Sequence, residues 1–166
     1  MAYKKKLYEE LMERQVAACE KSYFYESCWF AHAIFEDRFR SIVKYSGDGT
    51  RYGRKIAEKI EIILERHDAT VAKVVGGRPA RDKKSGKKKK VPKWPFLHTL
   101  DRGLVEEISN WTKERNDLAH DLADGNGTLF DSDMKCKALA ESGISLVKSL
   151  CAAARRVKKH SPLKGS

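Results

Sequence analysis

The sequence predicts an all-α protein, an antiparallel bundle of about five helices with a long basic loop between the third and fourth. Three observations lead to this fold class. Apolar residues recur at helical spacing over most of the 166 residues, alternating strand patterns are scarce, and turn-forming stretches separate the helical segments. A chain of this length fits one compact domain, expected over residues 1–158, with a basic tail over 159–166.

The first three helices follow from the apolar pattern. One is expected over residues 4–20, and a second runs from Ser22, a candidate N-cap, to about Tyr45, where a Gly/Asp-rich turn ends it. The apolar stripe of this second helix is Phe24, Cys28, Ala31, Phe35, Phe39 and Ile42. The third is expected from about residue 54 to residue 75, because Gly76 and Gly77 are typical of a helix C-terminus.

Residues 76–97 lack helical periodicity and are predicted to form a flexible Lys-rich loop, because so many like charges cannot pack on one another. The loop is a candidate clamp for an RNA backbone, with Trp94 or Phe96 available to stack a base. The candidate substrate-binding residues are Lys87, Lys88, Lys89, Lys90 and Trp94. The alternatives are a solvated loop or a nuclear-import signal, with Trp94 and Phe96 acting as core anchors.

A fourth helix is expected from His98 or Thr99 to the turn at residues 124–127, and a fifth over about 131–156. The apolar stripe of the fourth helix is interrupted by a charge. It consists of Leu100, Leu104, Ile108, Trp111, Leu118 and Leu122, with Arg115 at the position that should continue it. A buried, unpaired guanidinium is costly, so Arg115 should face a cleft, an acidic partner or a second subunit, or else pair with Glu36 or Asp37.

Composition limits which binding partners and which cellular compartment we expect. A net charge of +11 favours a polyanionic partner such as nucleic acid, an anionic membrane or an acidic protein, although a solvated basic surface fits equally well. The four cysteines are far apart without metal-ligand spacing, so we expect reduced thiols. We expect neither a signal peptide nor a membrane-spanning segment, and a cytoplasmic protein with no membrane partner.

The stretch WTKERNDLAH, residues 111–120, resembles the signature of the HEPN superfamily of α-helical domains, in which an Arg is followed after four to six residues by a His. Arg115 and Asn116 match the first two positions of that signature, and His120 matches the last. The order and length of the expected helices resemble the family over roughly residues 20–155. Many members are metal-independent endoribonucleases, and others only bind RNA or nucleotides.

The resemblance implies a homodimer in which two motifs form one composite active site, with RNA as the substrate and no cofactor or metal. It implies that His120 exchanges protons with the RNA 2′-hydroxyl or the leaving oxygen, a role that suits histidine near neutral pH. Arg115 would stabilise charge on phosphorus, and Asn116 would orient His120 or bind a phosphate oxygen. The expected products are a 2′,3′-cyclic phosphate and a 5′-hydroxyl.

The same resemblance suggests a toxin–antitoxin, defence or stress setting, with an antitoxin or regulatory protein as a further partner. In toxin-type members a Tyr often follows two residues after the His, and this sequence has Leu122 there. Leu122 therefore departs from the subgroup whose Tyr is modified by a nucleotidyltransferase, which leaves the kind of antitoxin open.

Two other functions remain open at the level of sequence. One is a non-catalytic module that uses the same groove to bind RNA or a protein. The other is an HD-type metal phosphohydrolase, in which His120 and Asp121 would form the central dyad. That enzyme also needs an upstream His and a downstream Asp, and the candidates are His67 or His98 and Asp131 or Asp133.

Overall fold

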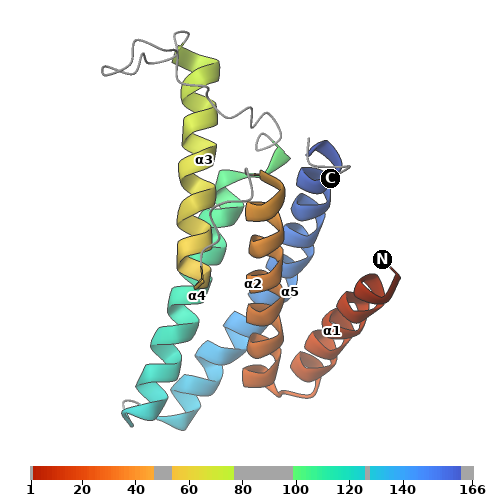
Figure 1. Cartoon of the computed structure of the whole chain (residues 1–166). Helices are drawn as coiled ribbons and strands as arrows, with labels where there is room; N and C mark the ends of the chain where they lie inside the picture. Colours follow the sequence, from red (N-terminus) through yellow and green to blue (C-terminus); the bar gives the residue numbers. More distant parts are fainter. Residues whose placement is uncertain (1, 47–53, 77–98, 126–127, 162–166) are drawn as a thin grey trace. The chain divides into compact units, whose positions relative to one another are not determined.

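A computed structural model of the chain confirms the all-α fold class (Figure 1). It describes residues 2–46, 54–76, 99–125 and 128–161, and these contain no strand. The five helices are α1 (Ala2–Glu20), α2 (Phe24–Ser46), α3 (Ile56–Gly76), α4 (Arg102–Ala123) and α5 (Leu129–His160). The predicted Lys-rich loop lies almost entirely outside the described residues, so its flexibility stays a prediction.

The largest differences from the expected helix boundaries are at the start of α4 and at the two ends of α5. α5 continues to His160 rather than ending near residue 156, so the predicted tail over 159–166 begins inside the helix. α4 begins at Arg102 rather than near His98 or Thr99, directly after Asp101, a residue type that commonly caps helices. α5 begins earlier than predicted because Thr128 caps it. The backbone N–H of Asp131 donates to Thr128 Oγ1 at 3.1 Å, and this hydroxyl donates to Asp131 Oδ2 at 2.7 Å.

The chain forms two compact units. Unit 1 contains residues 1–38 and 103–152, and unit 2 contains residues 39–102 and 153–166, so that α2 and α5 contribute to both. In unit 1, α1, α4 and the N-terminal parts of α2 and α5 pack side by side (Figure 1).

The core of unit 1 is centred on Trp111 of α4, which is 3% exposed. Its indole Nε1–H donates to the carbonyl oxygen of Leu139 on α5 at 2.8 Å, and its ring meets Phe35 of α2 edge-on at 5.1 Å between centroids. Gly143 of α5 lets the indole approach closely, since a Cβ there would lie 3.2 Å from Trp111 Cζ2. Trp111 therefore fixes α4 against α2 and α5 together.

A polar cluster ties α1 to α2. The hydroxyl of Tyr8 donates to Asp37 Oδ2, and Arg38 forms an ion pair with the same carboxylate at 2.7 Å while its guanidinium lies 3.8 Å from the centre of the Tyr8 ring. Burial and the hydrogen bond to Asp37 raise the pKa of the Tyr8 hydroxyl above its usual value. The protonated hydroxyl of Tyr8 thus joins α1 to the ion pair of Asp37 and Arg38 on α2.

The connection between α1 and α2 corrects the prediction that Ser22 is the N-cap of the second helix. Ser22 has a φ of 63°, its N–H donates to the carbonyl of Cys19, and the N–H of Tyr23 donates to the carbonyl of Ala18. These two bonds are those of a Schellman motif, in which the left-handed residue follows the helix end. Ser22 therefore ends α1 and does not begin α2, whose first carbonyl acceptor is that of Tyr23.

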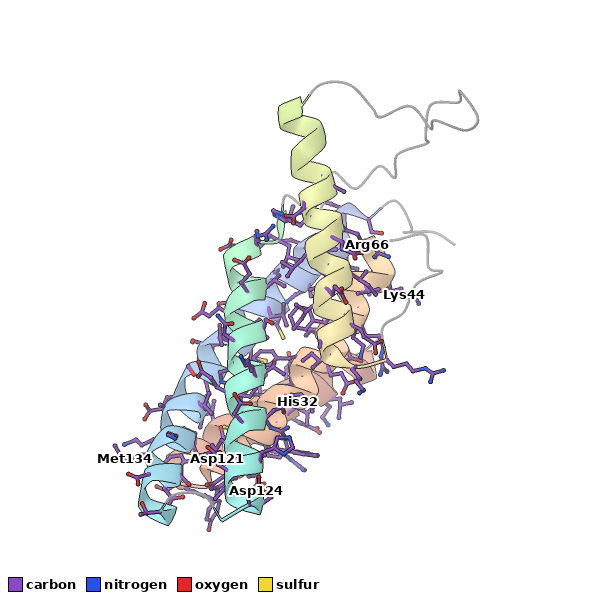
Figure 2. The ribbon with its side chains drawn as sticks, turned by 90° about the vertical axis from the view of Figure 1, so that its left-hand side faces the viewer. His32, Lys44, Arg66, Asp121, Asp124 and Met134 are labelled. Atoms are coloured by element: carbon purple, nitrogen blue, oxygen red, sulfur yellow. The ribbon has the colours of Figure 1, made fainter. Side chains whose placement is uncertain are left out.

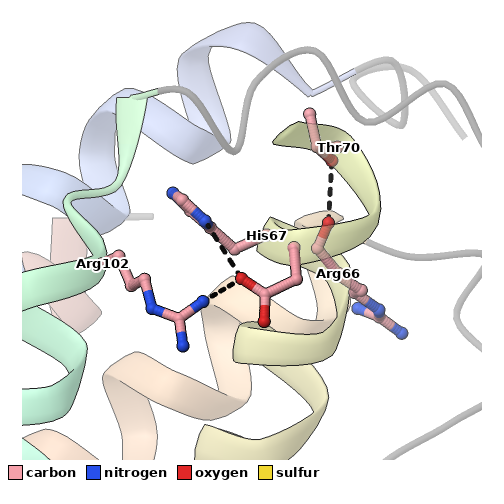
Figure 3. A network of polar contacts seen from close by, with 5 residues as sticks. Arg66, His67, Thr70 and Arg102 are labelled. Carbon is pink, nitrogen blue, oxygen red and sulfur yellow. Dashed lines mark hydrogen bonds and ion pairs between the residues drawn. The ribbon is translucent and has the colours of Figure 1, made fainter. Parts of the chain in front are cut away.

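Unit 2 packs α3 against the C-terminal end of α2 through Arg66, which donates to the Val43 carbonyl and to Ser46 Oγ, each at 2.8 Å. One helical turn along, Thr70 donates its hydroxyl to the carbonyl of Arg66 (Figure 3). Asp68 of α3 is paired with Arg102 and lies 3.9 Å from Nδ1 of His67. These polar contacts accompany an apolar interior to which α3 contributes Ile60 and Ile63.

Replacing Ser22 by Gly is expected to stabilise the protein by about 1 kcal/mol, because glycine removes the steric cost of a left-handed L-residue. Urea unfolding followed by circular dichroism measures the change. Ser22→Ala is the matched control and should bring no gain, since it keeps the Cβ. Equal stability of the Gly and Ala variants would contradict this interpretation of the turn.

Tyr8→Phe is expected to destabilise the protein at about pH 8 and to do so less above about pH 10, the pKa of an exposed tyrosine. The folded pKa of Tyr8 is raised, so its stabilising effect is present below the unfolded pKa and is lost as the pH rises toward the folded one. Urea unfolding of both proteins at the two pH values gives the difference. A difference that does not change with pH would show that the Tyr8 proton is not involved.

Candidate functional site

The C-terminal half of α4 carries the motif residues. Trp111 and Leu118, which are 3% and 6% exposed, hold this part of the helix in the core of unit 1. At about 100° per residue, Asn116 and His120 lie about 40° apart around the helix, while Arg115 and His120 lie about 140° apart. Asn116 and His120 are both exposed and Arg115 is half-buried. Within one chain, the Arg and the His therefore point in different directions.

Arg115 reaches the surface at the edge of the apolar stripe. Its guanidinium donates to Asn116 Oδ1 at 3.0 Å, and its Cζ lies 5.3 Å from the centre of the Trp29 ring on α2. A guanidinium over an indole face is held by a cation–π interaction. Arg115 thus contacts both Trp29 on α2 and Asn116, which shares a face of α4 with His120.

Of the two carboxylates predicted to support Arg115, Asp37 has other partners. Asp37 pairs with Arg38 and accepts the hydrogen bond from Tyr8, so these contacts serve the α1–α2 junction. Glu36 is half-buried on α2, seven residues after Trp29 and four after His32. At these intervals the three side chains follow one face of the helix. Figure 2 shows His32 at the same end of unit 1 as Asp121 and Asp124 of α4.

The predicted RNA clamp, Lys87, Lys88, Lys89, Lys90 and Trp94, lies outside the described residues, and its role stays a prediction. A second cation that the sequence analysis did not single out is Lys113 on α4. It is exposed and lies three residues before Asn116 and seven before His120. Lys113, Asn116 and His120 therefore form one polar row along the helix.

Trp29 is the other residue that the sequence analysis missed. Its side chain is 64% exposed, and Tyr25, one turn earlier on α2, is 43% exposed. The available signal was its position, because Trp29 directly follows Cys28 of the buried stripe and so falls about 100° away from it. A large aromatic residue outside the apolar stripe of its own helix is a candidate contact residue.

The opposite flank of the motif is acidic. A groove of about 560 Å³ runs between α4 and α5. It is lined by Glu114, Asp117, Leu118, Asp121, Lys135, Ala138, Leu139 and Ser142. Three carboxylates against one ammonium disfavour a polyanion, so a phosphate chain should approach α4 from the side of α2.

Beneath Arg115 lies a pair of buried thiols. The Sγ atoms of Cys28 on α2 and Cys136 on α5 are 4.0 Å apart, and none of the four cysteines forms a disulfide. The hydrogen bond to Cys136 and burial raise the pKa of the Cys28 thiol above its usual value, although the positive charge of Arg115 acts in the opposite direction. Cys28 therefore stays protonated and packs as a small apolar side chain.

The alternative function, an HD-type phosphohydrolase, requires a cluster of metal ligands. Within the described ranges, no three His, Cys, Asp or Glu side chains are grouped to hold a metal ion. His67 belongs to unit 2, where its neighbour is Asp68 (Figure 3), and His98 lies outside the described residues.

Comparisons with known proteins do not identify a family. No protein-family model matches the chain, and comparisons with curated proteins and with solved structures also give no significant match. Across the described residues, no helix has the length and apolar character needed to cross a membrane.

Arg115 and Arg38 should differ in what they contribute to stability. Arg115→Met is expected to change the free energy of unfolding by less than about 1 kcal/mol, because the cation contacts the exposed side chains of Asn116 and Trp29. Arg38→Met should cost about 2 kcal/mol, because it removes the guanidinium paired with the half-buried Asp37. Urea unfolding compares the two variants. An Arg115→Met variant as unstable as Arg38→Met would assign Arg115 a structural role.

Proposed function

We propose that this protein is a metal-independent endoribonuclease of the HEPN type, with Arg115, Asn116 and His120 as its catalytic residues. The observation that carries the proposal is the placement of Arg115. A cation interrupts an otherwise apolar stripe, extends to the surface, and bonds to the Asn that lies one turn before an exposed His. An arginine whose guanidinium contacts exposed side chains, on the same helix as a residue that can transfer protons, suits the cleavage of a phosphodiester.

The proposed reaction needs no external nucleophile. His120 takes the proton of an RNA 2′-hydroxyl, the 2′-oxygen attacks the adjacent phosphorus, and the bond from phosphorus to the 5′-oxygen breaks. The departing oxygen accepts a proton, leaving a 2′,3′-cyclic phosphate on one fragment and a 5′-hydroxyl on the other. Arg115 donates to the phosphoryl oxygens as negative charge accumulates on them.

The proposed active unit is a homodimer. Arg115 and His120 diverge by about 140° around α4, so one chain presents them to different points. Two copies related by a two-fold axis can place the Arg of one chain near the His of the other, and the second His can supply the proton for the leaving oxygen. A toxin, defence or stress role in the cytoplasm, restrained by an antitoxin or regulatory protein, is part of this proposal.

The second candidate is a non-catalytic HEPN-like module that binds RNA or a protein. It is favoured by the exposed aromatic side chains of Trp29 and Tyr25, which suit binding and are not needed for proton transfer. The third candidate, an HD-type phosphohydrolase, would require a divalent metal.

Incubation of the protein with end-labelled RNA in EDTA is the decisive experiment. The proposal expects fragments with cyclic-phosphate ends, and a loss of at least about 100-fold in rate for His120→Ala and Arg115→Ala. The matched controls are His160→Ala on α5 and Glu107→Ala on α4, both at exposed positions, and both should cleave like the wild type.

The other outcomes separate the alternatives. RNA that is bound but stays intact would reject catalysis and favour the binding module, and cleavage restored only by added divalent metal would favour the phosphohydrolase. Size-exclusion chromatography with light scattering tests the dimer. A monomer that still cleaves RNA would exclude the composite site while leaving the chemistry intact.

A further inference from the structure

We infer that Trp29, held by Arg115, is a stacking platform for an unpaired nucleobase of the bound nucleic acid. This inference rests on the RNA-binding part of the proposed function and adds to it a residue of α2. The starting observation is exposure, since 64% of Trp29 is accessible to solvent on a helix whose neighbouring residue, Cys28, is 3% exposed. A tryptophan so exposed, next to a cation of the candidate site, is typical of a contact surface.

The indole is already oriented before any ligand arrives. The guanidinium of Arg115 lies over the Trp29 ring at 5.3 Å, and the same guanidinium is fixed by its hydrogen bond to Asn116. Tyr25 follows the same face of α2 one turn earlier and is also exposed. Because the ring is oriented by Arg115, stacking a base on it costs less conformational entropy than ordering a free side chain.

The cation that contacts Trp29 indicates the kind of ligand. Arg115 supplies this positive charge, whereas the carboxylates of Glu114, Asp117 and Asp121 lie in the groove that α4 forms with α5, and Glu36 on the Trp29 face of α2 is half-buried. An anionic chain is therefore directed to the α2 flank of α4, where Trp29 lies. A ligand that needs both a cation and an aromatic face is a nucleotide, whose phosphate suits the guanidinium and whose base suits the indole.

The geometry also specifies an unpaired nucleotide. In a duplex both faces of each base are already stacked on neighbours, so an indole can stack only on a base of a single strand, a loop or a bulge. Such a base would be held beside the phosphate that Arg115 contacts. Trp29 would thereby determine which nucleotide is presented to His120, acting as a substrate-binding residue that does not touch the reacting atoms.

The test measures the binding of a short fluorescein-labelled 2′-O-methyl RNA, which cannot supply the nucleophile and stays intact with the wild-type chain. Fluorescence anisotropy in EDTA should show about tenfold or greater weakening for Trp29→Ala, with Trp29→Phe retaining most of the affinity. Met134→Ala is the control, since Met134 is a 56% exposed apolar residue on α5, and it should bind like the wild type.

A double-mutant cycle isolates the stacking. Oligonucleotides with one base removed at each position in turn should include a position whose loss weakens the wild type but not Trp29→Ala. If Trp29→Ala weakens binding equally at every position, with no such coupling, the platform is excluded. If light scattering shows that Trp29→Ala converts a dimer to monomers, Trp29 is an interface residue and the inference is also excluded.

The two proposals can fail separately. Coupling between Trp29 and one base in a protein that never cleaves RNA would overturn the ribonuclease and leave the platform. Cleavage that depends on His120, with a rate and an RNA affinity that Trp29→Ala leaves unchanged, would overturn the platform and support the ribonuclease. An unchanged urea unfolding midpoint for Trp29→Ala, measured in parallel, ensures that weaker binding reflects the lost ring rather than a lost fold.

Discussion

The packing of Trp111 is the constraint on which the rest of unit 1 depends. Its indole contacts α2 through Phe35 and α5 through the carbonyl of Leu139, and the absence of a side chain at Gly143 gives it the room to do so. These contacts fix the rotation of α4 about its own axis. Once Trp111 is inside, helical geometry leaves Arg115 at the margin of the interface and directs Asn116 and His120 to solvent.

Most of the fold could be predicted from the sequence because helical periodicity depends on residues that are close together in the chain. The stripe predicted for the second helix, for example, correctly grouped Cys28, Phe35 and Phe39, all of which are buried. Ser22 was misassigned because serine is common at N-caps, whereas its positive φ depends on how the backbone of α1 ends. Local propensity therefore identified the helices better than the turns between them.

The candidate site was only partly predictable for a different reason. The motif on α4 is contiguous in the sequence, so Arg115, Asn116 and His120 could be named together. The contact between Arg115 and Trp29 joins residues on two helices, and no spacing rule relates them. Asp37 illustrates the same limit, because its pairing with Tyr8 and Arg38 depends on where α1 docks.

The adjacent positions of Cys28 and Trp29 make α2 intolerant of changes in length near its start. One faces the core and the other the solvent, and each added or deleted residue upstream turns the following helix by about 100° relative to its cap. A one-residue deletion in the first turn of α2 would bring the indole to the buried position of the thiol, and a one-residue insertion there would bring the thiol to the exposed position of the indole. During divergence, this first turn should therefore accept substitutions far more readily than insertions or deletions.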